Sequence, residues 1–300
     1  MNYLLRLKKQ IERKIIIETL QNLNPLVGIK DYRYFGFGSV YFADFILFHK
    51  YLNIKKMISI DNKFEDEKRF RYNKPFKFID FEVIECTKYL QNNLNWDDKL
   101  LLWLDYDVPL SRDILSDVEY LASRVKSKDF FLITVEAECP LKPKDFLNMF
   151  DEYIPISYKS KTKIKKDFPI VLNKTLFTAL YNGLGNQISK LDFLQIFNFV
   201  YKDTKEMYTC GGIFGDKTVF DEVKEKLNEP DYLSHDERII NISCPILTPK
   251  EKTHLDSFIE KNGDIDCRFK PVKDVGLSTE EIQKYCIFYK HYPQFFESVY

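Results

Sequence analysis

Two glycines and an acid have the types and spacing to hold a ligand that carries a ribose. Gly36 and Gly38 lie in the run Tyr34-Phe-Gly-Phe-Gly-Ser-Val, and Asp61 follows the hydrophobic stretch 57–60. Glycine lets a backbone approach a ligand closely, and a carboxylate at a strand end can accept hydrogen bonds from ribose hydroxyls. The alternative is a turn between a strand and a helix that binds nothing, with Asp61 capping the next helix.

A second group of acids, Asp105 and Asp107, follows the continuous apolar run 100–104. Ligands of open α/β sheets gather where buried strands end, and two acids two residues apart point to the same side of an extended segment. Both carboxylates could therefore face one cleft, where they would orient a nucleophile or take its proton. Their alternative role is helix capping or contact with a basic loop.

The elements around the glycines predict a βαβ unit that holds an adenosine-containing cofactor. A short strand over 30–35 enters the glycine turn, a helix covers about 40–52, and a strand over 57–60 ends at Asp61. The N-terminus of that helix would offer unpaired N–H groups to the ligand.

Further alternation of strands and helices predicts an α/β fold with a mostly parallel, doubly wound sheet. The expected strands cover 78–85, 100–104 and 130–135, and the expected helices cover 3–23, 63–71, 89–94, 111–125 and 172–181. The pattern of the leading helix stops at Asn24-Pro25. Strands over 195–201 and 206–214 are predicted to be antiparallel, because the segment between them is too short for a parallel crossover. Residues 157–167 show no apolar period and predict a basic loop.

The chain divides into a predicted main domain, residues 1–216, and a mainly helical extension, residues 217–300, packed on it. Capping boxes at 248–251 and 278–281 open two helices of the extension. Several aromatic residues near its end could form a surface for a protein partner or for self-association, or could pack back on the domain. They are Phe288, Tyr289, Tyr292, Phe295, Phe296 and Tyr300.

Composition excludes several classes of protein. Lysine plus arginine equals aspartate plus glutamate, 45 each, so no global charge attracts nucleic acid or an anionic membrane. The six cysteines are scattered without CxxC spacing, and the four histidines have no spacing for a metal site. Charge interrupts the N-terminus too early for a signal peptide, and no apolar run is long enough to span a membrane. We therefore expect a cytoplasmic protein without a metal.

The glycine turn also excludes two nucleotide-binding motifs. A dinucleotide site needs a small residue three positions after the second glycine, and this chain has Tyr41 there. A phosphate-binding loop of nucleoside triphosphatases ends in GK[ST], which GFGS lacks. The run LDYDVPL, residues 104–110, is not the Asn/Asp-Pro-Pro-Tyr signature of enzymes that methylate amino groups of nucleic acids.

The order of these features resembles that of class I S-adenosylmethionine-dependent methyltransferases, with their Rossmann-like sheet, over about residues 30–215. The resemblance implies that Gly36, Phe37, Gly38 and Ser39 pass under the methionine end of S-adenosylmethionine. It further implies that Asp61 holds the ribose, that Glu85 lies near the adenine and that Asp105 lies beside the transferable methyl group. The first motif of the family commonly begins with an acid and ends with a third glycine; here Tyr34 and Val40 stand at those positions.

Further candidates for acceptor binding follow the fourth and fifth strands. Tyr106 could stack on an acceptor ring, and Glu136 could bind a substrate cation or act as a base. Lys163 belongs to a lysine cluster at the position where methyltransferases often carry substrate-binding insertions. The alternative for the tyrosine is a packing role, and the alternative for the charged residues is a place in solvated loops.

The sequence thus predicts a methyltransferase that uses S-adenosylmethionine, with Asp105 and Asp107 as catalytic residues and an oxygen or nitrogen of an unidentified acceptor as nucleophile. The alternative is a catalytically silent methyltransferase-like subunit that senses nucleotides or serves as a scaffold. It is motivated by the absence of the first-motif acid and by the long extension. A nucleic-acid acceptor bound by the lysines ranks last because the net charge is zero.

Overall fold

One sheet organises the molecule in the computed structural model, which describes residues 6–139, 142–187, 190–227, 232–233, 238–266 and 275–293. Its strands are β1 Arg33–Gly36, β2 Lys56–Asp61, β3 Ile79–Val83, β4 Leu100–Pro109, β5 Phe130–Glu136, β6 Asp192–Lys202, β7 Glu206–Gly215 and β8 Ile240–Ile242. They lie in the order β3-β2-β1-β4-β5-β7-β6-β8. The first five are parallel, whereas β7 is antiparallel to both β5 and β6. The predicted doubly wound sheet with its antiparallel hairpin is confirmed.

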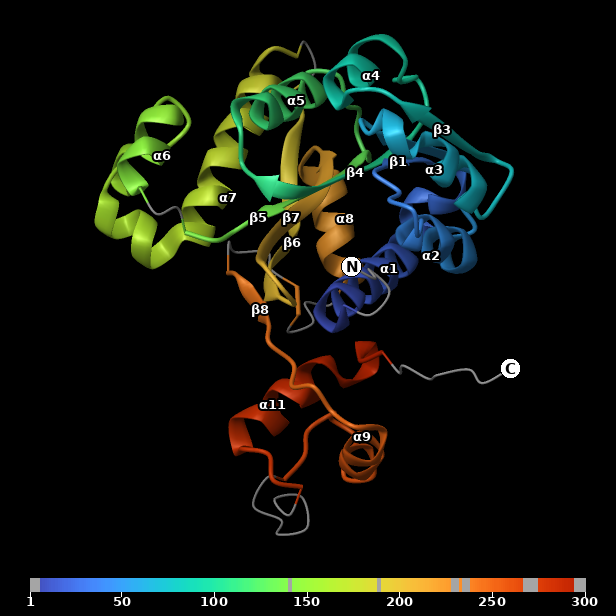
Figure 1. Ribbon diagram of the computed structural model, residues 1–300, viewed down its shortest axis with the longest axis vertical. Helices are drawn as coiled ribbons and strands as arrows, with labels where there is room; N and C mark the ends of the chain where they lie inside the picture. The colour runs from blue at the N-terminus through green and yellow to red at the C-terminus, as the bar shows by residue number, and fades with distance from the viewer. Residues whose placement is uncertain are drawn as a thin grey trace.

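Helices cover both faces of the sheet (Figure 1). One layer consists of α1 Leu7–Val27, α2 Ala43–Leu52, α3 Glu67–Asn73 and α8 Lys217–Leu227. The other consists of α4 Cys86–Asn92, α5 Arg112–Ala122 and α7 Lys161–Gly185. Alternate residues of each strand face the two layers, so that Trp103 packs with the first layer and Leu104 with the second. Burial on both faces explains why the parallel strands are continuous apolar runs.

Helix α1 extends further than the sequence predicted. It passes through Pro25 and ends after Val27 at Gly28, which adopts a left-handed conformation with φ of 70°. Leu23 and Val27 are both buried against the core and lie one turn apart, so packing offsets the hydrogen bond that Pro25 removes. The helix therefore stops where glycine permits a C-cap and not at the proline.

The basic segment 157–167 is not a loop, contrary to the prediction. From Lys161 it forms the first turns of α7, and the hydroxyl of the N-cap Ser160 accepts a hydrogen bond from the N–H of Lys163 at 3.1 Å. Ile164 and Phe168 are buried one turn apart. These two residues supply an apolar period that the surrounding lysines obscure in the sequence.

Residues after β7 combine a strand with helices. The strand β8, which was not predicted, pairs in parallel with the end of β6. Helices α9 Pro249–Asp256 and α11 Thr279–Phe288 begin with the two predicted capping boxes and lie in a lobe below the sheet (Figure 1). Their buried side chains join the same core cluster as α1. Within the described parts of the chain, no helix is long and apolar enough to cross a membrane.

The aromatic residues near the C-terminus pack inward where the structure describes them. Phe288 is 1% exposed and Tyr292 is 8% exposed, and the Tyr292 hydroxyl accepts a hydrogen bond from the N–H of Leu247. For these two residues the structure shows the alternative that the sequence left open, packing back on the core. Phe295, Phe296 and Tyr300 lie outside the described residues.

Candidate active site

The carboxyl ends of β1, β2 and β4 bring the predicted site residues together. Gly36, the last residue of β1, pairs with Ser59 on one side and with Trp103 on the other. Asp61 and Asp105 lie two residues further along these neighbouring strands, and both face the layer that contains α1 and α2. The two carboxylates therefore flank the point where β1 ends and the glycine loop, residues 37–42, begins.

The glycine loop has an unusual backbone conformation, and contacts with neighbouring residues of the protein fix it. A Cβ at Gly38 would lie 2.5 Å from the Ser59 Oγ, and the N–H of Gly38 donates to that oxygen at 3.1 Å. Ser39 and Phe42 have φ of 45° and 46°, although neither is a glycine. Such conformations cost on the order of 1–3 kcal/mol each and cluster at functional sites. The strained loop is thus held in place by packing around Gly38.

Tyr34 stands at the position of the missing first-motif acid, and its hydroxyl donates to a carboxylate from another element. The acceptor is Asp44 in the first turn of α2, and both residues are buried. Burial raises the pKa of the Asp44 carboxyl, while the nearby Arg13 charge opposes that rise. Burial and Asp44 raise the pKa of the Tyr34 phenol, which keeps it a donor. A carboxylate is therefore present beside this strand, but it is supplied by α2.

The first turns of α1 place a lysine against Asp105. The Nζ of Lys9 lies 2.8 Å from Oδ1 of Asp105 and 2.8 Å from Oε2 of Glu12. It also lies 4.6 Å from the centre of the Trp103 ring, which adds a cation–π contact. Burial alone lowers the pKa of the Lys9 ammonium, but the two carboxylates outweigh burial and raise that pKa above its ordinary value. Lys9 is therefore a buried cation fixed beside Asp105.

The β6–β7 turn holds this end of α1 in place. Both carboxylate oxygens of Asp203 accept hydrogen bonds at 3.0 Å, one from the N–H of Lys8 and one from the N–H of Lys9. This turn lies at the same edge as the carboxyl end of β5, because β6 runs parallel to β5. Asp203 thus caps α1 and aims Lys9 toward Asp105.

Sequence reasoning missed Lys9, Glu12 and Arg13, which are each 3% exposed or less. Charged residues on a helix are usually solvated, so burial was not expected at these three positions. A signal existed, since the apolar stripe Ile16, Leu20, Leu23 continues toward the N-terminus through these three positions. A charged residue where a buried stripe should continue indicates a polar site beneath the helix.

The remaining cofactor and acceptor candidates differ in how they are held. One oxygen of Asp61 accepts from the N–H of Lys63 at 2.8 Å, and burial raises the pKa of this half-buried carboxyl. Glu85 is exposed immediately before α4. The Tyr106 hydroxyl donates to Asp117 at 2.7 Å, which fixes its ring edge-on to Phe37 with 5.0 Å between ring centres.

Three other predicted residues lie toward the surface. Asp107 is exposed beyond Asp105, where the pairing of β4 with β5 becomes irregular. Glu136 forms an ion pair with Lys205 of the β6–β7 turn at 2.7 Å. Lys163 lies 3.5 Å from Asp167, one turn along α7. Among the residues that the structure describes, no cluster of histidine, cysteine or acidic side chains could hold a metal ion.

Comparison with known proteins identifies the family. All of residues 1–300 match the model of a family described as "Putative O-methyltransferase". The chain belongs to this family. Membership confirms the predicted activity, methyl transfer from S-adenosylmethionine to an acceptor. A search of curated proteins gave no match.

Several solved structures resemble this methyltransferase at low identity. The N-methyltransferase NodS from Bradyrhizobium japonicum WM9, in complex with S-adenosyl-L-homocysteine, is 9% identical; the match covers 69% of this chain and 88% of that chain, with a TM-score of 0.39. Cofactor-bound Rv0187 from MTB is 9% identical over 65% of this chain and 79% of that chain, with a TM-score of 0.38. The Methanococcus jannaschii fibrillarin pre-rRNA processing protein is 11% identical over 63% of this chain and 68% of that chain, with a TM-score of 0.38.

Proposed function

We propose that S-adenosylmethionine binds between the glycine loop and the first turns of α1, and that Asp105 orients the nucleophile of a hydroxyl-bearing acceptor. The observation that carries this proposal is the buried ion pair of Lys9 with Asp105 at the carboxyl end of β4. A charged pair is costly to bury, so its presence at the edge where α/β sheets bind ligands favours a functional role.

The donor set fits this cofactor. Asp61 would accept hydrogen bonds from the ribose hydroxyls, and the Asp105 carboxylate would face the positive sulfonium. Arg13 is buried, and its Nε and Nη1 have no hydrogen-bond partner among the described residues. We assign these two donors to the carboxylate at the methionine end of the cofactor, since two buried guanidinium nitrogens without acceptors are otherwise costly.

When bound, S-adenosylmethionine supplies a methyl group on a positively charged sulfur, which a nucleophile displaces in line. Lys9 holds Oδ1 of Asp105, so Oδ2 is the oxygen that would accept a hydrogen bond from the acceptor hydroxyl. That carboxylate takes the hydroxyl proton as the new oxygen–carbon bond forms. Lys9 keeps its own proton, because its pKa is raised, and therefore orients the base without competing with it. Such positioning is the main source of catalysis in this chemistry.

Titration calorimetry with S-adenosylhomocysteine tests the cofactor site. We expect the wild type to bind and the Asp61→Ala variant to lose about tenfold or more in affinity, the loss of a charge-assisted hydrogen bond. The matched control is Asp80→Ala, which removes an exposed carboxylate from the neighbouring strand β3. Equal affinities of wild type and Asp61→Ala would refute the ribose assignment, and no binding by the folded wild type would refute the site.

Two further proposals concern the location of the protein in the cell and its domain organisation. We propose a cytoplasmic location, supported by the finding that none of the five cysteines that the structure describes forms a disulfide. We also propose that residues 217–300 extend the main domain without forming an independent one, because their core is continuous with that of α1. Cell fractionation tests the first, and a single cooperative unfolding transition would support the second.

A further inference from the structure

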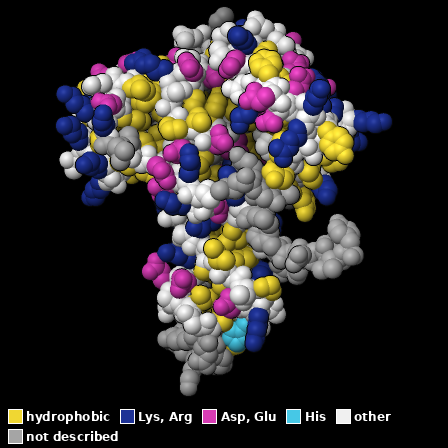
Figure 2. Space-filling view, viewed as in Figure 1, with side chains coloured by type: hydrophobic (Ala, Val, Ile, Leu, Met, Phe, Trp, Pro, Cys, Tyr) yellow, Lys and Arg dark blue, Asp and Glu magenta, His cyan; other side chains and the backbone are white. Residues whose placement is uncertain are grey.

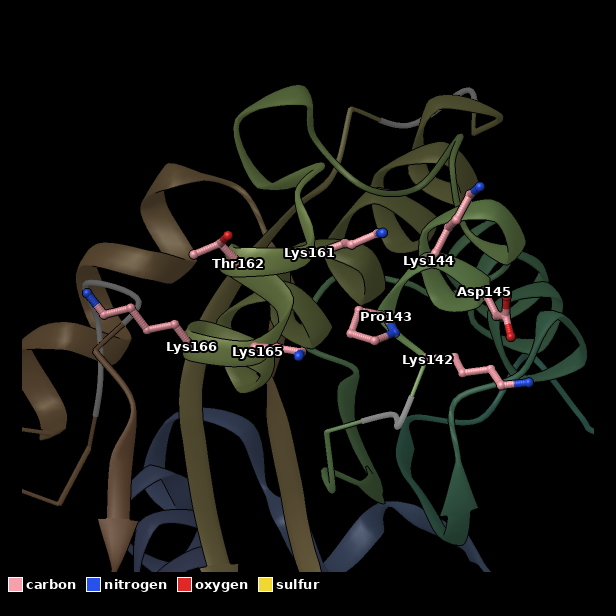
Figure 3. Close-up of a pocket in the computed structure, with 8 residues that line it drawn as sticks. All are labelled: Lys142, Pro143, Lys144, Asp145, Lys161, Thr162, Lys165 and Lys166. Carbon is pink, nitrogen blue, oxygen red and sulfur yellow. The ribbon is translucent and has the colours of Figure 1, made fainter.

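An open cavity of about 750 Å³ lies between α6, Pro143–Met149, and the start of α7. We call it the lysine cavity, and it is lined by Lys142, Pro143, Lys144, Asp145, Lys161, Thr162, Lys165 and Lys166. In Figure 3, Lys161 reaches from α7 toward α6, and Lys165 extends toward Pro143. Figure 2 shows basic side chains gathered over this side of the upper lobe, although the whole chain carries no net charge.

The charges of the lysine cavity are not balanced by nearby acids. Five lysines and one aspartate line it, and within the described residues none of these lysines forms an ion pair. Neighbouring lysines outside the cavity do have partners. Lys159 lies 3.0 Å from Asp151 and Lys163 lies 3.5 Å from Asp167. The lysines of the cavity therefore differ from these neighbours in having no acidic partner among the described residues.

The backbone of this region adds rigidity. Helix α7 begins at Lys161, and its backbone departs from helical geometry at Asp167, so only the short first segment of the helix borders the cavity. Phe146 of α6 packs edge-on against Phe168 of α7, with 5.2 Å between ring centres. The lysines thus project from two helices that are fixed to each other by buried aromatic contacts.

We propose that the lysine cavity binds phosphate groups of the methyl acceptor. Several lysines that line one cavity are suited to binding phosphate, and a cavity of this size accommodates a small phosphorylated molecule. The cavity lies on the connection that leaves β5, whose Thr134 is paired with Asp105. An acceptor held here by its phosphate would have to extend past the edge of the sheet to bring another part of the molecule to Asp105, which faces the layer of α1 and α2. The role as acceptor site rests on the proposed function, whereas phosphate binding does not.

Calorimetry with sodium tripolyphosphate tests the binding directly. We expect the wild type to bind and Lys161→Gln/Lys165→Gln to bind about tenfold more weakly, because both lysines are exposed and contribute charge more than packing. The control Lys224→Gln/Lys226→Gln removes two exposed lysines from α8 and should bind like the wild type. No binding by the wild type, or equal losses in both double variants, would overturn the proposal.

A second arm distinguishes a small phosphorylated acceptor from a nucleic-acid backbone. If a single-stranded oligonucleotide binds, competes with tripolyphosphate, and loses roughly 1–2 units of salt-dependence slope in Lys161→Gln/Lys165→Gln, the phosphates belong to nucleic acid. If only tripolyphosphate binds, the acceptor is a small molecule. S-adenosylhomocysteine affinity measured on the same variants should stay at the wild-type value. An unchanged S-adenosylhomocysteine affinity would show that the cofactor site is intact even if the lysine cavity does not bind phosphate.

Discussion

Replacing Lys9 by methionine should destabilise the protein by removing the cation between two buried acids. The side chain of Glu12 is 0% exposed and that of Asp105 is 25% exposed. Removing one partner of a buried ion pair costs about 3–5 kcal/mol, because the remaining charge is uncompensated. The partial exposure of Asp105 lets water reach it, so we expect the lower end, about 3 kcal/mol. At roughly 2–4 °C for each kcal/mol in a large domain, the Tm should fall by roughly 6–12 °C.

The pH dependence of this loss follows from the direction of the pKa shifts. In the wild type the pKa of Lys9 is raised, so its contribution to stability is complete below the ordinary lysine value of 10.5 and does not change near neutrality. Burial raises the pKa of Glu12, and Lys9 opposes that rise. Without Lys9 the folded-state pKa of Glu12 should increase further. A raised carboxyl pKa makes the folded state lose stability as the pH rises through it, so the Tm difference should be larger at pH 8 than at pH 5.

Thermal unfolding followed by circular dichroism at pH 5 and pH 8 measures both effects. Adding Glu12→Gln to Lys9→Met should recover part of the lost stability, because the amide needs no counter-charge. The control is Lys8→Met. Among the described residues the ammonium of Lys8 donates only to the carbonyl of Lys202 at the surface, so this change should cost less than about 1 kcal/mol. A Lys9→Met protein that unfolds within about 2 °C of the wild type at both pH values would refute the account of the buried pair.

Three further predictions concern other parts of the fold. Gly38→Ala should cost about 1–3 kcal/mol in denaturant unfolding because the new methyl would meet neighbours at 2.5 Å and 2.7 Å, whereas Gly185→Ala, with nothing within 4 Å, should be neutral or stabilising. Burial raises the pKa of Asp129 from 3.8 to about 6, so stability should fall by about 3 kcal/mol as the pH rises through this range, and Asp129→Asn should lose that dependence. Tyr34→Phe leaves the buried Asp44 without its donor and should cost about 1.5–3 kcal/mol in the same assay.

The sequence predicted most of the strands because their signals are local, although β4 runs on to Pro109, five residues beyond the expected end at 104. Continuous apolar runs identify buried parallel strands, and the acids Asp61 and Asp105 follow two of them directly. The short connection between β6 and β7 fixed their direction. Strand β8 was missed because Ile240–Ile242 is too short to show a period, and it becomes a strand only by pairing with β6.

The charged end of α1 could not be placed from the sequence because its burial depends on distant segments. In the sequence, β1, β2 and β3 lie between Lys9 and Asp105. Asp203, which caps α1, comes much later, in the turn between β6 and β7. A helix with lysine and glutamate in its first turns has the same local pattern whether water or a sheet edge lies beneath it. Only the assembled sheet decides between the two.

The antiparallel hairpin therefore does more than close the sheet. Because β6 ends at the edge where β4 and β5 end, its turn brings Asp203 to the N-terminus of α1. That cap orients Lys9, and Lys9 in turn holds one oxygen of Asp105; the proposed mechanism assigns the other oxygen to the acceptor. The position of the proposed base thus depends on a chain of contacts from the last strands of the sheet to the first helix. The first-motif acid is missing, but acidic groups are still present at this edge of the sheet, because α1 supplies Glu12 and α2 supplies Asp44.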